Sequence, residues 1–200
     1  MQPETDQALE LLALHDPQHA QRLRTRIDLE EDKSSALCDL ASQLVAHERN
    51  NPAARIFMAA LTLKPQCTAA HKGLGLLLES AGFYEDAADS FASAIELQPC
   101  SEHHYLLARS LQRAGQTELC SLHYNTALQL DPENIDAWYN LGVLLATAGQ
   151  LIDASSAFAE VTKRAPSVAR AWTSLGAVRA QLSDEAGAIC CLQKAVALEP

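Results

Sequence analysis

Prolines return along this sequence at intervals of 33 or 34 residues, and this period constrains the fold more than any other feature. A leucine or aromatic side chain lies eight residues before each proline, and a small side chain lies four residues before that. The prolines are Pro65, Pro99, Pro132, Pro166 and Pro200, the large residues are Phe57, Phe91, Tyr124, Phe158 and Leu192, and the small ones are Ala53, Ala87, Cys120, Ala154 and Ala188. Three residue columns in register over five copies predict a repeat protein.

A further pair of columns predicts that each copy consists of two closely packed helices. A leucine followed by a small residue recurs at Leu40-Ala41, Leu74-Gly75, Leu107-Ala108, Leu141-Gly142 and Leu175-Gly176. Two helices approach closely where one side chain is nearly absent and a large neighbour fills the adjoining space. In the fourth copy Trp138 and Leu141 follow helical spacing, as do Ala154 and Phe158 after a break at 148–150. In three copies this turn contains a glycine, at Gly82, Gly115 and Gly149. In the first and last copies Glu48 and Ser183 replace it.

These columns resemble the tetratricopeptide repeat, whose pattern is W-x2-L-G-x2-Y, then alanine, then A-x3-F and a final proline, with a period of 34 residues. The resemblance implies an all-α fold, a right-handed superhelical solenoid of antiparallel helix pairs. The five predicted copies are 34–67, 68–100, 101–134, 135–168 and 169–200. Leu37, His71 and His104 stand where the family prefers tryptophan, which predicts softer packing in the first three copies.

The two ends of the array are expected to differ. Residues 1–33 do not fit the repeat, but their apolar residues have helical spacing on both sides of Asp16-Pro17, which predicts a helical cap on the first copy. Near Pro200 no polar helix follows to cover Ala188, Leu192 and Ala195. We therefore expect either a longer native chain, which we favour, or a homo-oligomer formed through the uncapped last copy.

The resemblance also implies that the first helix of each pair lines a concave groove, which is the candidate binding site. The predicted groove residues are Asp39, Lys72, Tyr105, Arg109, Tyr139, Asn140, Arg170 and Ser174. This mixture predicts binding of an extended or helical peptide, with Asn140 pairing with its backbone and Arg109 or Arg170 meeting carboxylates. The competing interpretation is that the tyrosines are only half-buried and the arginines only solvated. We expect a protein-interaction scaffold whose partner is a protein or a peptide.

Two specialised groups within the family suggest narrower functions. Chaperone-binding members clamp a C-terminal carboxylate with cations and asparagines. In this chain Asn140 matches the middle asparagine, but Arg109 stands where the first asparagine is expected. Tyr105 and Ser174 replace two of the cations. O-linked N-acetylglucosamine transferases hold peptides on ladders of groove asparagines, and Asn140-Leu141-Gly142 resembles one rung. The alternative function is therefore an N-terminal substrate-recruiting module of a larger enzyme such as a glycosyltransferase, without a catalytic domain in these 200 residues.

Composition and the lack of catalytic motifs exclude several other classes. The net charge of -10 and the pI near 5.1 argue against nucleic acid, which binds through lysine and arginine. No long apolar span or targeting segment is present, so we expect no membrane association and a cytoplasmic protein. Phosphate-binding loops, nucleophile elbows and zinc-protease motifs are also missing, which predicts no enzymatic activity and no cofactor.

The cysteines and histidines do not have the spacing of a metal site. The six cysteines include no CxxC pair, and most of them fall in predicted helices, where a reduced thiol acts as a small buried hydrophobe. His103 and His104 lie close to Cys100 and Glu102, but without zinc-ligand spacing. We therefore predict no metal site and reduced, structural thiols.

Overall fold

The computed structural model describes residues 3–14, 16–28 and 33–199, and every regular element in that part of the chain is an α-helix. The chain divides into two compact units, residues 1–99 (unit 1) and residues 100–200 (unit 2), which are described separately. The helices of unit 1 are α1 (Pro3–Ala13), α2 (Pro17–Asp28), α3 (Lys33–Ala46), α4 (Asn50–Leu63), α5 (Thr68–Ser80) and α6 (Tyr84–Leu97). Those of unit 2 are α7 (Ser101–Arg113), α8 (Thr117–Leu130), α9 (Ile135–Thr147), α10 (Leu151–Arg164), α11 (Ala169–Gln181) and α12 (Glu185–Leu198).

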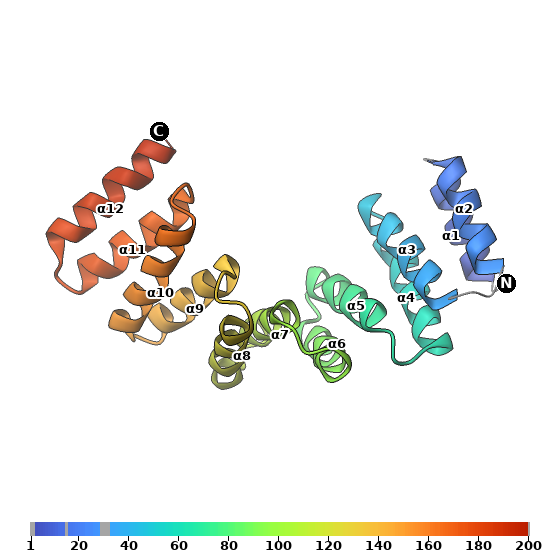
Figure 1. Ribbon diagram of the computed structural model, residues 1–200, viewed down its shortest axis with the longest axis horizontal. Coiled ribbons are helices and arrows are strands. Elements are labelled where there is room, and N and C mark those ends of the chain that lie inside the picture. The colour runs from blue at the N-terminus through green and yellow to red at the C-terminus, as the bar shows by residue number, and fades with distance from the viewer. Residues whose placement is uncertain (1–2, 15, 29–32, 200) are drawn as a thin grey trace. The chain divides into compact units, whose positions relative to one another are not determined.

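Within each unit the helices form antiparallel pairs that stack on the next pair (Figure 1). A three-residue turn joins the two helices of every predicted copy, as in α5–α6 and α9–α10. The predicted all-α fold of helix pairs is thus confirmed.

The small and large columns meet as the sequence predicted. A Cβ atom added to Gly75 would lie 2.8 Å from the ring of Phe91, and one added to Gly142 would lie 2.8 Å from the ring of Phe158. Both phenylalanines are almost completely buried. At Gly75 and Gly142 the absence of a side chain therefore lets the second helix of the pair lay its aromatic ring on the backbone of the first.

The turns within the pairs need a left-handed backbone. Gly82, Gly115 and Gly149 have φ angles between 76° and 87°. Glu48 and Ser183 hold the same turn position with φ angles of 59° and 63°, a conformation that costs a residue with a Cβ atom about 1–2 kcal/mol. The backbone therefore adopts one turn geometry in all five copies, even where glycine is absent.

The tryptophan column tolerates histidine better than the sequence suggested. The indole N–H groups of Trp138 and Trp172 donate to the carbonyl oxygens of the prolines six residues earlier, at 2.9 and 2.8 Å. His71 makes the equivalent contact, with Nε2 3.0 Å from the carbonyl oxygen of Pro65. His104 instead contacts His123, because its copy starts one residue closer to the preceding proline. The expected softening of the early packing is thus offset at His71.

The N-terminal helices share one core with the first copies of unit 1. Helices α1 and α2 contact α3, and α1 also contacts α4. The shared core includes Leu12, Leu23 and Ile27 together with Leu40 and Phe57. Helices are therefore present at both segments with helical spacing, while the role of residues 1–33 as a cap and the five copy boundaries stay predictions.

The last helix, α12, exposes a different apolar set from the predicted one. Ala188 and Ala195 are buried, whereas Leu192 is 41% exposed, together with Ile189 at 57% and Val196 at 65%. The prediction was wrong for the two alanines because Ala188, Cys191 and Ala195 are the buried residues of α12, which packs against α11.

Candidate functional site

Six of the eight predicted groove residues belong to unit 2 and lie on the first helices of its three pairs. Tyr105 and Arg109 are on α7, Tyr139 and Asn140 are on α9, and Arg170 and Ser174 are on α11. Together with Asp136 on α9 these side chains form hydrogen bonds, an ion pair and cation–π contacts that link neighbouring copies. We call these seven residues the A-helix network.

The first half of the A-helix network joins α7 to α9 through the hydroxyl group of Tyr105. Nη1 of Arg109 and Nδ2 of Asn140 each donate to this oxygen at 3.3 Å. The guanidinium of Arg109 also lies 5.2 Å from the centre of the Tyr105 ring, within cation–π range. The ring in turn packs against buried Tyr124, with ring centres 6.2 Å apart. A cation and an amide are therefore held at fixed positions on two successive copies.

The second half joins α9 to α11 in the same register. The hydroxyl groups of Tyr139 and Ser174 are 3.3 Å apart, and the guanidinium of Arg170 lies 4.6 Å from the centre of the Tyr139 ring. Arg170 also pairs with Asp136 at 3.3 Å, and both side chains are about 60% exposed. The Tyr139 ring stands edge-on to Phe158, with ring centres 5.6 Å apart. The packing between the helices of the pair thus orients the tyrosine.

The two contacts between copies obey one spacing rule. Tyr105 with Asn140 and Tyr139 with Ser174 are each separated by 35 residues, which is one repeat plus one position. The third and fourth copies therefore each present a tyrosine hydroxyl to the residue that follows the corresponding position in the next copy. The 35-residue spacing is present in the sequence. The columns do not show it, because each contact joins one column to the neighbouring column of the next copy.

The other two predicted residues, Asp39 and Lys72, belong to unit 1. A carboxylate oxygen of Asp39 lies 2.6 Å from Nη1 of Arg26 on α2, and both side chains are about half exposed. Lys72 is half-buried on α5. The structure therefore brings six of the predicted residues together in unit 2 and places Asp39 in a separate ion pair. The sequence prediction missed Arg26 and Asp136, although Asp136 precedes its partner Arg170 by one 34-residue period.

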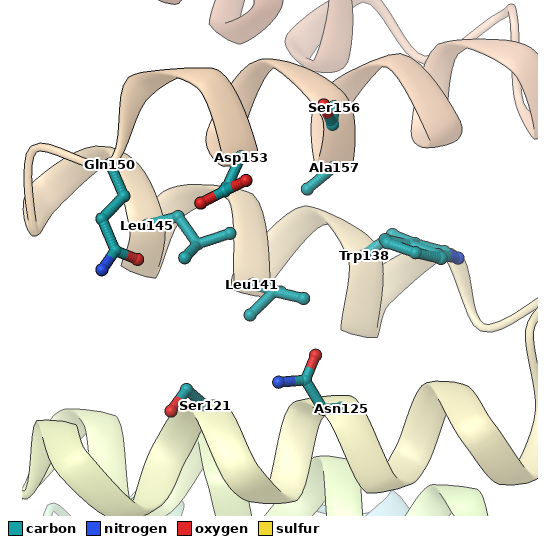
Figure 2. Close-up of a pocket in the computed structure, with 9 residues that line it drawn as sticks. All are labelled: Ser121, Asn125, Trp138, Leu141, Leu145, Gln150, Asp153, Ser156 and Ala157. Atoms are coloured by element: carbon teal, nitrogen blue, oxygen red, sulfur yellow. The ribbon is translucent and has the colours of Figure 1, made fainter.

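Unit 2 also contains a cleft that the sequence did not predict, between α8 and the pair α9–α10 (Figure 2). Its volume is about 420 Å³. Leu141, Leu145 and Ala157 supply apolar lining, and the rest of the lining is Ser121, Asn125, Trp138, Gln150, Asp153 and Ser156. Figure 2 shows Asn125 on α8 directed across the opening toward Leu141. The cleft was missed because the prediction considered only the first helix of each pair.

One copy later an arginine takes the position of Leu145. Arg179 lies 34 residues after it, and its guanidinium reaches the carboxylate of Asp184 at 3.8 Å and the sulfur of Cys191 at 3.7 Å. Asp184 and Cys191 correspond to the cleft residues Gln150 and Ala157. The same place in the repeat is thus occupied by a charged side chain in the last copy and left open in the fourth.

The histidines of the third copy form a close pair. The Nδ1 atoms of His104 and His123 are 3.1 Å apart, and the rings stack with their centres 5.3 Å apart. Burial lowers the pKa of both rings, and the charges of His123 and His103 lower that of His104 further. In the part of the chain that the structure describes, no three His, Cys, Asp or Glu side chains gather as a metal site would require. The described helices also include none that is long and apolar enough to cross a membrane.

Comparison with solved structures finds the same fold over most of the chain. YrrB, described as a TPR protein with an unusual peptide-binding site, is 24% identical with a TM-score of 0.76, and the match covers 89% of this chain and 92% of that one. MamA from Desulfovibrio magneticus RS-1 is 19% identical with a TM-score of 0.77, over 84% of this chain and 96% of that one. A chain of the APC/C hetero-tetramer Cut9-Hcn1 is 17% identical with a TM-score of 0.73, over 90% of this chain and 36% of that one. At these identities the likeness concerns the fold alone.

Sequence comparison gives a consistent assignment. A search of curated proteins finds no match. A sequence profile described as tetratricopeptide repeat matches residues 38–102 and 148–200, which is more than half of the chain, and one described as TPR repeat matches residues 108–149. Such repeats generally form non-catalytic scaffolds for protein–protein interactions. With its repeat columns, its stacked helix pairs and these matches, the chain belongs to the tetratricopeptide repeat family.

Proposed function

We propose that the A-helix network of unit 2 binds an extended segment of a partner protein that carries at least one carboxylate. The observation that supports this most directly is the continuity of the network. Tyr105 and Tyr139 contact the next copy in the same register, through Asn140 and Ser174, and an arginine lies over the ring of each tyrosine. An extended peptide that crosses these helices would meet a tyrosine with an arginine over its ring at two successive steps.

The amide of Asn140 suits a peptide backbone. Its Nδ2 donates to Tyr105, while its Oδ1 accepts no hydrogen bond from any residue in the described ranges. A side-chain amide can accept a backbone N–H and donate to the next carbonyl oxygen. Asn140 therefore fixes the position of the chain without selecting its side chains.

The arginines suit a carboxylate. Arg109 and Arg170 each present a guanidinium held over a tyrosine ring, and guanidinium groups bind carboxylates with paired hydrogen bonds. The ion pair of Arg170 with Asp136 is well exposed, so it contributes about 0–1 kcal/mol and offers little resistance to an incoming acidic group. The arginines would thus select acidic segments, and their spacing would set the register.

The family supports a partner of this kind without identifying it. YrrB is a TPR protein with a peptide-binding site, and it shares this fold at 24% identity. Recruitment of a substrate to an attached enzyme would use the same surface, so both functions considered from the sequence depend on peptide binding by the network.

The experiment is selection of peptides from a random display library on the full chain, followed by affinity measurement with the Arg109→Ala/Asn140→Ala double variant. Hydrogen bonds to charged groups contribute about 1.5–3 kcal/mol, so we expect binding to weaken by roughly tenfold or more. The matched control, Gln129→Ala/Lys163→Ala, removes an amide and a cation from the exposed sides of α8 and α10. Unchanged affinity in the first double variant, or equal loss in both, would remove the network from consideration.

A further inference from the structure

Two cysteines of unit 1 lie close together although 28 residues separate them in the sequence. The Sγ atoms of Cys38 and Cys67 are 3.6 Å apart. Cys38 is on α3 and is 5% exposed. Cys67 is the residue that caps the N-terminus of α5, and it is half-buried. The sequence prediction treated these thiols as separate packing residues and did not bring them together.

The surroundings of Cys67 stabilise its thiolate. Burial by itself would raise the pKa of this thiol, but the neighbouring Ser34 and Cys38 side chains, the nearby N–H of Ala70 and the charge of Lys64 together lower the pKa below its ordinary value. A helix N-terminus supplies this kind of stabilisation because its first N–H groups point at the capping residue. The thiolate is the reactive form of cysteine, so Cys67 is chemically distinct from the buried thiols.

Two buried thiols in unit 2 provide the contrast. Burial raises the pKa of Cys120 and of Cys191, so both stay protonated at neutral pH. Cys120 donates its S–H to the carbonyl oxygen of Gln116 within its own helix. These two thiols fit the structural role that the sequence suggested, and Cys67 does not.

We propose that Cys67 is a peroxide-reactive thiol that forms a disulfide with Cys38. The Cys67 thiolate attacks one oxygen of hydrogen peroxide, and the O–O bond breaks. Hydroxide is the leaving group, and the product on Cys67 is a sulfenic acid. The Cys38 sulfur then attacks the Cys67 sulfur, the S–O bond breaks, and water is released with the Cys38 proton. In total two thiols and one hydrogen peroxide give one disulfide and two waters, so peroxide is the only oxidant needed.

The geometry favours these steps in this order. Cys67 is the more exposed residue of the two, so peroxide reaches it first, and buried Cys38 lies beside it as the resolving thiol. The backbone of Cys67 is extended, with φ at −99° and ψ at 96°, so its side chain is outside the helical ladder. Forming the disulfide would bring the sulfurs from 3.6 Å to the bond length of about 2.0 Å. The product would join the first helix of copy one covalently to the start of copy two.

The test uses the full chain, reduced and then treated with an equimolar amount of hydrogen peroxide, alkylated and digested with trypsin. We expect a linked pair of peptides spanning residues 34–49 and 56–72, lighter by two hydrogens than the separate peptides and separated by dithiothreitol. Cys38→Ser should lose the link and leave a sulfenic acid on Cys67 that dimedone traps. Cys67→Ser should lose both products.

Cys100 provides the matched control. It caps α7 at the same repeat position as Cys67, but Lys72 stands in copy two where copy one has Cys38. We expect Cys100→Ser to leave the linked peptides unchanged, and iodoacetamide to modify Cys67 faster than Cys100 in the untreated wild-type chain. Alkylation of Cys67 no faster than Cys100, or peroxide products spread evenly over the cysteines, would overturn the proposal even if a variant failed to fold.

Discussion

The two units use the same helix pair but differ at two neighbouring positions of its first helix. In unit 2 the first of these positions holds a tyrosine in two copies. Its hydroxyl contacts the residue at the second position of the next copy, 35 residues later, as in Tyr105 with Asn140 and Tyr139 with Ser174. In unit 1 the same register pairs Cys38 with Gly73, which has no side chain to offer, and Cys38 lies beside Cys67 instead. In copies two and four the columns that pack the helix pair are thus independent of the positions that link successive copies, whereas Gly73 in unit 1 also makes room for the ring of Phe57.

This independence explains how one scaffold accommodates different surfaces. The contacts of Gly75 with Phe91 and of Gly142 with Phe158 have the same separation in the two units, 2.8 Å from the position of an added Cβ atom. The packing residues are buried between the helices of a pair, whereas the linking side chains of unit 2 are half-buried on the first helix. Changes in the first set should therefore alter stability in both units, and changes in the second should alter binding in one.

The largest expected effect comes from removing the buried rings. Phe158→Ala and Phe91→Ala should each reduce stability by about 3–5 kcal/mol, because each leaves a cavity between the helices of a pair. Only Phe158 supports a tyrosine of the A-helix network, so only Phe158→Ala should also weaken peptide binding. Both tryptophans lie in unit 2, so their fluorescence follows that unit during urea unfolding while circular dichroism follows all helices.

The contrast between the two rings is the control for this prediction. Phe91→Ala should shift the circular dichroism transition more than the tryptophan transition, and Phe158→Ala should shift both. Equal loss of peptide affinity in the two variants would contradict the separation of packing from recognition.

A smaller effect is expected from filling the glycine positions. Gly142→Ala places a methyl group 2.8 Å from the Phe158 ring, and Gly75→Ala does the same at Phe91, so either ring or backbone must move. Overpacking of this kind costs about 1–3 kcal/mol, partly offset by the better helix propensity of alanine, which contributes up to about 1 kcal/mol. Urea unfolding should give similar losses for the two variants. A loss confined to one of them would show that the packing differs between the units.

The turn residues should respond in the opposite direction. Glu48→Gly in unit 1 and Ser183→Gly in unit 2 relieve a left-handed backbone and should each raise stability by at most about 1 kcal/mol. Gly115→Ala, which introduces the same strain, is the reverse control and should lower stability. Thermal unfolding provides the measurement, and a lower melting temperature for both glycine variants would contradict the strain.

The sequence predicted the contacts within a helix pair, which follow from the period. It did not predict the contacts between side chains of successive pairs. The pairing of Gly142 with Phe158 follows from two columns that must pack, so it was predictable. Neither the approach of Cys38 to Cys67 nor the cleft beside Asn125 was predicted, because both depend on how one pair stacks on the next. His71 was read as a weak substitute for tryptophan because residue type alone does not show that its ring nitrogen reaches the carbonyl oxygen of Pro65.

The smallest expected effect is on the pH dependence of unit 2, through the pair of His104 and His123. Burial lowers the pKa of both rings in the folded chain, and the nearby histidine charges lower that of His104 further. At a pH between the folded and unfolded pKa values, the unfolded chain therefore binds more protons than the folded chain. Stability therefore rises with pH in that window, is fully present above the unfolded value near 6.5, and is lost as the pH falls below it. His123→Gln should flatten the change in urea midpoint between about pH 7.5 and pH 5.5, read from tryptophan fluorescence, and the change should be modest because both rings are partly exposed. A steeper dependence in the variant than in the wild type would reverse the sign of the argument, since it would require the folded chain to hold the extra proton.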